Sequence, residues 1–316
     1  MKHLLFVTEK WCDAKPKLSF TNNFHNSFNS FSRSVDNWSF DTLHIDEAAL
    51  TYKADINEVL IRYCENNKPD LIIFSLLGAT PYNPSDNTYR KLREMNIKTC
   101  VFWPDTGPSW GMQTIEEIND LVDLHVSWDN PRSNWHDSYP KLNNHISLWT
   151  PEDDSLFYPT LEKSIDVSFL GSVNGYRERI AILSTLRESF PNAIISGGQR
   201  TSRLTPSAYA KLIRNSKIGV NFPISQSGVF YQAKGRIFEY TASNCLLIDI
   251  KNPATEGFFK PNEDYVEAFS ERDLMEKIKY YLEHEDERKR IALKGHQTFS
   301  EKWTAKIFWK TLLSKL

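Results

Sequence analysis

The sequence has little of what marks membrane, disulfide-stabilised or nucleic-acid-binding proteins. None of its apolar runs approaches the roughly 20 residues of a membrane-spanning helix, so we expect no transmembrane segment. Its formal net charge is −2, which provides no overall positive field to draw it to nucleic acid or anionic lipid. The four cysteines form no C-x-x-C pair, and three of them lie inside apolar runs, as small core residues do. These absences indicate a globular, cytoplasmic protein.

Metal-ligand spacing is also absent. The eight histidines are scattered along the chain, and no D-x-D motif occurs. Asp153-Asp154 is an adjacent acidic pair, but it stands within Trp149–Pro159, whose turn formers, acids and prolines are typical of a linker. We therefore expect neither a metal site nor a cofactor.

What the sequence does hold is a regular alternation of strand and helix patterns. Its 316 residues, 40% hydrophobic and 25% charged, fit two globular domains. Before the linker, the predicted strands include Leu4–Thr8, Asp70–Leu77 and Lys98–Trp103, with helices at Ile56–Asn66 and Ser85–Met95. After it, they include Asp166–Leu170, Lys217–Phe222 and Cys245–Ile250, with helices at Arg177–Phe190 and Lys234–Ser243. The alternation predicts two α/β domains with parallel sheets, residues 1–150 and 151–300, and a C-terminal helix, 301–316, that packs back toward the first.

One segment departs from the alternation. Lys10–Asn37 follows the first strand and is rich in Asn, Ser and Phe. Ligands of open α/β sheets bind outside the carboxyl ends of strands, so the segment is placed to shape a pocket. The alternative is a surface helix whose core stripe is Phe24, Phe28 and Phe31, at spacings of four and three. The two interpretations are compatible.

The second half carries the clearest chemical pattern. Gly235 and Arg236 open a predicted helix, and Glu239 follows Arg236 one turn later. Free N–H groups at a helix start attract phosphate, and an arginine there adds a bidentate clamp. A carboxylate on the same face can accept both hydroxyls of a ribose. The alternative is an exposed Arg–Glu pair.

A resemblance favours the ligand site. The run K-G-R-I-F-E-Y-T-A-S-N-C-L-L-I-D, from Lys234 to Asp249, resembles the nucleotide-binding segment of GT-B glycosyltransferases of the spore-maturation (CgeB-like) group. Asp166–Ser172 followed by Arg177, Glu256–Phe259, and Arg288–Gly295 agree with it, so the likeness covers roughly residues 165–300. It implies the GT-B fold, in which two Rossmann-like domains face a central cleft, and a metal-independent sugar transfer from a nucleotide donor such as a UDP-sugar.

The same resemblance implies roles for several residues of the second domain. Arg236 and Arg177 would hold the diphosphate, and Glu239 the ribose. The donor loop and helix start would add Gly171, Ser172, Lys234 and Gly235. For Arg177 the alternative is an exposed helix arginine beside Glu178.

A narrower likeness concerns the acceptor. Residues 242–249 are similar to a run of phage DNA β-glucosyltransferase, which also has an Asp at the end of a first-domain strand, as Asp105 is here. Asp105 is our candidate general base, and Trp103 and Trp110 would desolvate it. With Lys10 and Trp11, these tryptophans are the acceptor-side candidates. The alternative for Asp105 is a turn residue after Pro104.

The reaction remains open in two respects. Retaining relatives carry an E-x7-E pair, and Tyr231 stands where its first Glu would be, which favours inversion. The acceptor is either a hydroxymethylated base in phage DNA or a surface, lipid-linked or protein-linked glycan, and the host compartment is a bacterial or phage-infected cytoplasm. The alternative function is a non-catalytic two-domain protein that binds a nucleotide or a sugar.

Overall fold

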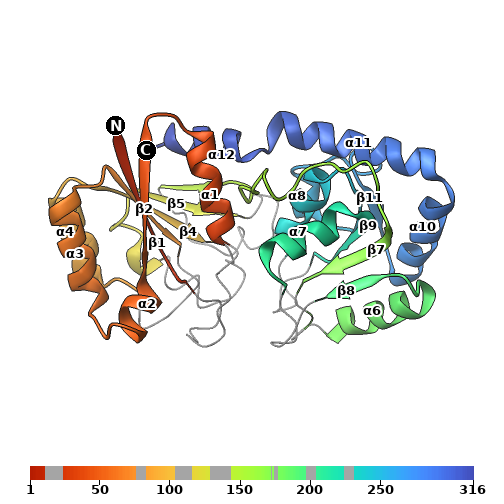
Figure 1. The fold of residues 1–316 in the computed structure, drawn as a ribbon, viewed down its shortest axis with the longest axis horizontal. Helices are drawn as coiled ribbons and strands as arrows, with labels where there is room; N and C mark the ends of the chain where they lie inside the picture. Colours follow the sequence, from red (N-terminus) through yellow and green to blue (C-terminus); the bar gives the residue numbers. More distant parts are fainter. Residues whose placement is uncertain are drawn as a thin grey trace. The chain divides into compact units, whose positions relative to one another are not determined.

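The computed structural model describes residues 1–10, 24–75, 83–103, 116–128, 144–171, 173, 177–196, 204–223 and 231–316. The chain divides into two compact units (Figure 1). The first contains the described residues up to Pro151 together with Lys306–Leu316, and the second contains Glu152–Ala305. The change from one unit to the other after Pro151 falls inside the predicted linker.

The first unit is built on a parallel sheet of strand order β2-β1-β3-β4-β5-β6. The strands are β1 (Lys2–Thr8), β2 (Trp38–His44), β3 (Leu71–Ser75), β4 (Lys98–Trp103), β5 (Leu124–Ser127) and β6 (His145–Ser147). The helices are α1 (Phe24–Ser34), α2 (Ile45–Leu50), α3 (Ile56–Asn67), α4 (Asp86–Glu94) and α12 (Ala305–Leu313).

One face of this sheet is covered by α3 and α4. Side chains alternate along a strand, so Leu5 and Val7 of β1 point to the same face. They join one buried apolar cluster with Leu60 of α3 and Leu92 of α4. Burial of both faces explains why the strands read as continuous apolar runs in the sequence.

The other face is covered by α1 and α12. Phe6 of β1 stacks on Phe28 with ring centroids 4.4 Å apart, and its ring also contacts Phe31 and Trp309. The Trp309 indole N–H donates to the Ser30 hydroxyl at 2.9 Å, within the buried layer. The surface helix predicted in this segment is therefore confirmed for α1.

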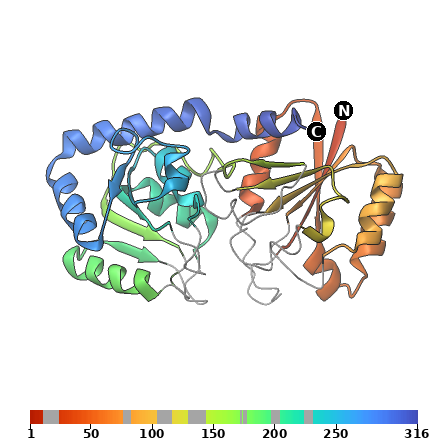
Figure 2. The same ribbon diagram turned by 180° about the vertical axis from the view of Figure 1, so that it is seen from behind.

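The second unit is built on a parallel sheet of strand order β11-β10-β9-β7-β8. Its strands are β7 (Ile165–Leu170), β8 (Ile194–Ser196), β9 (Ser216–Asn221), β10 (Leu246–Ile250) and β11 (Val266–Ala268). The helices are α6 (Arg177–Ser189), α7 (Pro206–Arg214), α8 (Gly235–Ala242), α9 (Pro253–Glu256), α10 (Glu271–Glu283) and α11 (Glu285–Lys302). The long helix α11, seen from behind in Figure 2, packs against α8 and β10.

In each sheet the strand order reverses beside the first strand of the unit. β1 lies between β2 and β3, and β7 lies between β8 and β9. Open parallel sheets bind ligands outside their carboxyl ends at such a switch point. The edges to inspect are therefore those where Thr8 and Ser75 end their strands in the first unit, and Leu170 and Asn221 in the second.

Candidate functional site

Helix α8 begins at the switch point of the second sheet. The side chain of its N-cap residue, Lys234, makes no capping hydrogen bond to the N–H groups of the first turn. The helix is anchored by Tyr240, whose hydroxyl donates to the carbonyl oxygen of Ser168 in β7 at 3.1 Å. The Tyr240 ring lies against Gly219 of β9, where a Cβ atom would come within 2.2 Å of it. The positive end of the α8 dipole is thus fixed on the sheet and favours an anion.

Arg236, in the first turn of α8, reaches both strands at the switch point. Its Nη1 donates to the carbonyl oxygen of Leu170 at 3.3 Å, and its Nε donates to Oδ1 of Asn221 at 3.3 Å. Both acceptors are neutral, so these bonds position the guanidinium without neutralising it. The half-buried guanidinium is thus held at the strand ends, where it can bind a phosphate.

Gly171, directly after β7, leaves room for this guanidinium. A Cβ atom at position 171 would lie 2.2 Å from Nη1 of Arg236. The fold therefore brings together Gly171 and the helix start at Lys234, Gly235 and Arg236, which the sequence had singled out separately.

A second arginine, Arg179 of α6, shares an aromatic ring with Arg236. The guanidinium carbons of Arg179 and Arg236 lie 5.6 and 4.9 Å from the ring centroid of Phe169. Arg179 is only 5% exposed, and it also lies 5.5 Å from the ring centroid of Phe222. Cation–π attraction holds both groups on these rings. Two cations gathered beside a helix start suit a ligand group with more than one negative charge.

Glu239 stands one turn after Arg236 on α8. Its Oε2 accepts the hydroxyl of Tyr209, from α7, at 2.6 Å. Burial raises the pKa of Glu239 to about 7, while the Tyr209 hydrogen bond and the charge of Arg236 act in the opposite direction. In its ionised form the carboxylate only accepts hydrogen bonds, which suits the hydroxyls of a sugar.

Glu152 places a second carboxyl near Glu239. It is 6% exposed, and its pKa is raised well above its ordinary value by burial first and then by the charges of Glu239 and Asp153. The predicted linker thus contributes a buried acid to the site.

A buried network of hydrogen bonds holds Asn221, the side chain to which Arg236 donates. Asn221 donates from Nδ2 to Oδ1 of Asp249 at 3.0 Å, which turns its own Oδ1 toward Arg236. Asp249 also accepts the hydroxyl of Thr255 at 2.7 Å and the amide of Asn252 at 3.3 Å. Burial raises the pKa of Asp249 to about 6. The network orients the group that holds the guanidinium.

Several residues predicted from sequence fall outside this description. Trp11, Asp105, Trp110 and Ser172 lie outside the described residues. Arg177 opens α6, but its side chain also lies outside them.

Sequence reasoning missed Arg179, although a signal was present. Leu183 and Leu186 of α6 are buried, and Arg179 precedes them by four and seven residues, on the same helix face. Arg177 does not share that spacing. Tyr209 and Asn221 carried no comparable signal, because only the tertiary fold sets their contacts.

The described acceptor-side candidates lie in the first unit. Trp103 is 1% exposed and its indole N–H donates to Nδ1 of His125 at 2.9 Å, so it fills the core and does not present its ring to a ligand. Lys10 is half-buried, and its ammonium lies 2.5 Å from Oε1 of Glu47.

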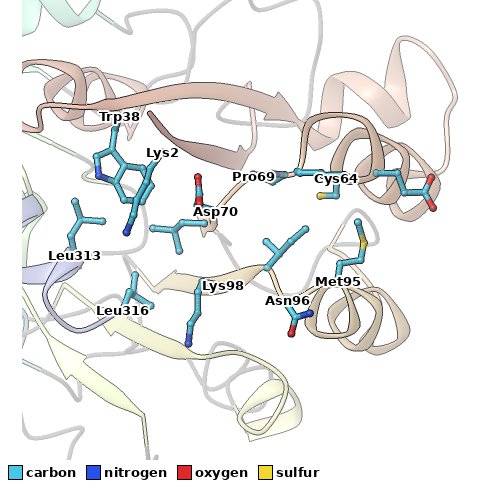
Figure 3. Close-up of a pocket in the computed structure, with 14 residues that line it drawn as sticks. Lys2, Trp38, Cys64, Pro69, Asp70, Met95, Asn96, Lys98, Leu313 and Leu316 are labelled. Carbon is cyan, nitrogen blue, oxygen red and sulfur yellow. The ribbon is translucent and has the colours of Figure 1, made fainter.

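A cavity of about 830 Å³ lies at the other edge of the first sheet, where its strands begin (Figure 3). Lys2, Trp38, Asp70 and Lys98 line it, and the Lys2 ammonium is 5.4 Å from the Trp38 ring centroid. Ligands of open parallel sheets bind at the carboxyl edge, so this cavity is not the candidate site.

The described part of the chain lacks two features. It contains no group of three or more His, Cys, Asp or Glu side chains placed to hold a metal ion. None of its helices combines the length and apolar character that crossing a membrane requires.

In its fold the chain matches solved structures along its whole length. Sucrose-phosphate synthase of Thermosynechococcus elongatus matches with a TM-score of 0.63 at 10% identity, over 100% of this chain and 98% of that one. HepE of Anabaena, in complex with UDP and glucose, matches with a TM-score of 0.62 at 9% identity, over 100% of both chains. A glycosyltransferase of Rickettsia africae matches with a TM-score of 0.58 at 10% identity, over 99% and 97%. These likenesses confirm the predicted class, a GT-B fold with two Rossmann-like domains.

The family follows from the sequence itself. Residues 156–314, about half of the chain, match the family described as glycosyl transferase-like. No curated protein matches the chain in sequence. The chain belongs to the glycosyl transferase-like family and is a glycosyltransferase, as its resemblance to that class had predicted.

Proposed function

We propose that the chain transfers a sugar from a UDP-sugar, bound by the second unit, to a hydroxyl of an acceptor. The observation that carries this proposal is Arg236 at the start of α8, fixed on the ends of β7 and β9 with Glu239 one turn behind it. The HepE structures with UDP and with UDP-glucose support uridine diphosphate as the nucleotide.

In this proposal each group of the site has a role in holding the donor. Arg236, Arg179 and the N–H groups of α8 bind the diphosphate, with Ser172 and Arg177 adding to the loop after Gly171. Glu239 accepts hydrogen bonds from the ribose. Because the arginines and the helix dipole stabilise the negative charge of the leaving diphosphate, the transfer needs no metal ion.

We further propose that the transfer inverts the anomeric carbon. Tyr231 replaces the first acid of the pair found in retaining relatives. Inversion requires a carboxylate base for the acceptor hydroxyl, for which Asp105 is the candidate from sequence. Both acceptor classes, hydroxymethylated DNA bases and glycans, supply such a hydroxyl.

Calorimetric titration of UDP into the wild type and two variants tests the donor site. We expect Arg236→Ala to raise the Kd roughly 10- to 100-fold, because it removes charge-assisted hydrogen bonds. Glu239→Ala should raise it by about tenfold on the same scale. Arg272 and Glu276 form an exposed pair on α10, so Arg272→Ala and Glu276→Ala are matched controls that should bind UDP normally. Wild-type affinity in both site variants would refute the assignment.

A further inference from the structure

An unassigned carboxylate stands at the switch point of the first sheet. Glu9 directly follows β1, the strand beside which the order of that sheet reverses. Ser75, which ends β3, lies at the same edge. By topology the position of Glu9 after β1 corresponds to that of Gly171 after β7, against which the Arg236 guanidinium lies in the second unit.

Glu9 is buried without the partners that buried carboxylates have. It is 9% exposed, and no hydrogen bond or ion pair within the described structure reaches its carboxyl. Burial, followed by the negative charge of Asp46, raises the pKa of Glu9 to about 7. A largely buried carboxylate without a partner costs folding free energy when it ionises, and such groups are found most often at functional sites.

The neighbouring charged groups are engaged with one another. Asp46, on α2, accepts the backbone N–H groups of Lys10 at 2.8 Å and of Glu47 at 2.9 Å. The Lys10 ammonium pairs with Glu47. Burial lowers the pKa of His44, at the end of β2, which keeps that imidazole neutral and leaves it no positive charge to offer Glu9.

Unsatisfied hydroxyl groups mark the same edge. Oγ1 of Thr8 and Oγ of Ser75 are fully buried, and neither has a hydrogen-bond partner within the described structure. The parallel register pairs Val7 with Phe74, so the next residues, Thr8 and Ser75, lie side by side. Two hydroxyl groups at this edge thus make no hydrogen bond within the described structure.

We propose that Glu9, in place of Asp105, is the catalytic base that takes the proton of the acceptor hydroxyl. This inference rests on the proposed transfer from a UDP-sugar. As the proton moves to the Glu9 carboxylate, the acceptor oxygen bonds to the anomeric carbon. The bond from that carbon to the β-phosphate oxygen breaks, and its electron pair leaves with UDP. Glu9 then releases the proton to water.

Transfer and donor hydrolysis, measured with UDP-glucose, UDP-galactose and UDP-N-acetylglucosamine, test the role of Glu9. The acceptors are water, simple glycans and hydroxymethylcytosine DNA. With the donor saturating at every pH, we expect Glu9→Gln to lower the rate about 100-fold or more, to remove the rise of rate through pH 7, and to leave the Kd for UDP unchanged. Asp105→Asn is the competing variant, and Glu47→Gln is the matched control at the same edge.

A stability measurement separates catalysis from structure. Between pH 4.5 and 7 the folded protein keeps a proton on Glu9 that the unfolded chain releases, so this group destabilises the wild type increasingly as the pH rises. Glu9→Gln should therefore melt at a higher temperature than the wild type at pH 8, and close to it at pH 4.5. A variant that is less stable at both pH values has lost a structural group, which would contradict the proposal.

The remaining outcomes are distinct. Wild-type turnover in Glu9→Gln, or a loss confined to Asp105→Asn, would overturn the role of Glu9 and leave the proposed function standing. A wild type that binds UDP but turns over no donor would also overturn it. A wild type that does not bind UDP would remove the proposed function and this inference together.

Discussion

Glu239 shows how strongly one residue depends on its surroundings. The same i, i+3 spacing to Arg236 would give an ordinary exposed pair on a solvated helix. Here the carboxyl is half-buried, accepts the Tyr209 hydroxyl, and lies near the buried Glu152. Its pKa of about 7 makes its charge depend on pH in the neutral range.

This titration predicts a pH dependence of donor binding. If the ribose requires the ionised carboxylate, UDP affinity at pH 6 should be about tenfold weaker than at pH 8, in proportion to the ionised fraction. Tyr209→Phe removes a hydrogen bond that lowers the pKa of Glu239, so the midpoint should move to higher pH. Calorimetry across this range measures both. Glu239→Gln is the control for the ionisation of the phosphate itself, and a profile unaltered by that change would contradict the ribose role.

Residue-scale contacts also show where sequence reasoning reaches its limit. Arg236 and Glu239 were predictable because helix start, charge and spacing all stand in one short run. The burial of Arg179 could have been predicted from its helical spacing to the apolar residues of α6. Glu152 and Glu9 were not predictable, because burial of an acid within a linker or after a strand end is decided by distant elements.

At the scale of elements, close strand–helix contacts at two glycines set the position of α8. Gly219 of β9 receives the Tyr240 ring, and Gly171 after β7 receives the Arg236 guanidinium. The strands and helices around them were largely predictable, since β7, β9 and β10 are apolar runs and α8 lies within the predicted range 234–243. Their order in the sheet, which creates the switch point, has no local signature in the sequence.

Substitution of the two glycines should affect different properties, UDP affinity at Gly171 and stability at Gly219. In Gly171→Ala the new Cβ displaces the flexible Arg236 side chain, so UDP affinity should fall about tenfold with little change in stability. In Gly219→Ala the Cβ meets the buried Tyr240 ring, so we expect a loss of about 1–3 kcal/mol in the free energy of unfolding. Denaturant unfolding and UDP titration of both variants measure the difference. Unchanged UDP binding in Gly171→Ala would count against the positioning of Arg236.

At the scale of the whole molecule, the two units share one arrangement of strands and charged residues. A parallel sheet buried on both faces reverses its strand order beside its first strand, and charged residues gather at the carboxyl edge there. In the second unit they are the arginines of the proposed donor site, and in the first unit Glu9. The GT-B fold and the glycosyltransferase family set the class of reaction. The chemistry proposed for this chain comes from these two edges.

A crystal structure of the chain with bound UDP tests the donor site most directly. We expect the diphosphate within hydrogen-bonding distance of the Arg236 guanidinium and the first N–H groups of α8, and the ribose hydroxyls at Glu239. UDP bound elsewhere, with Arg236 and Glu239 making no contact to it, would contradict the account.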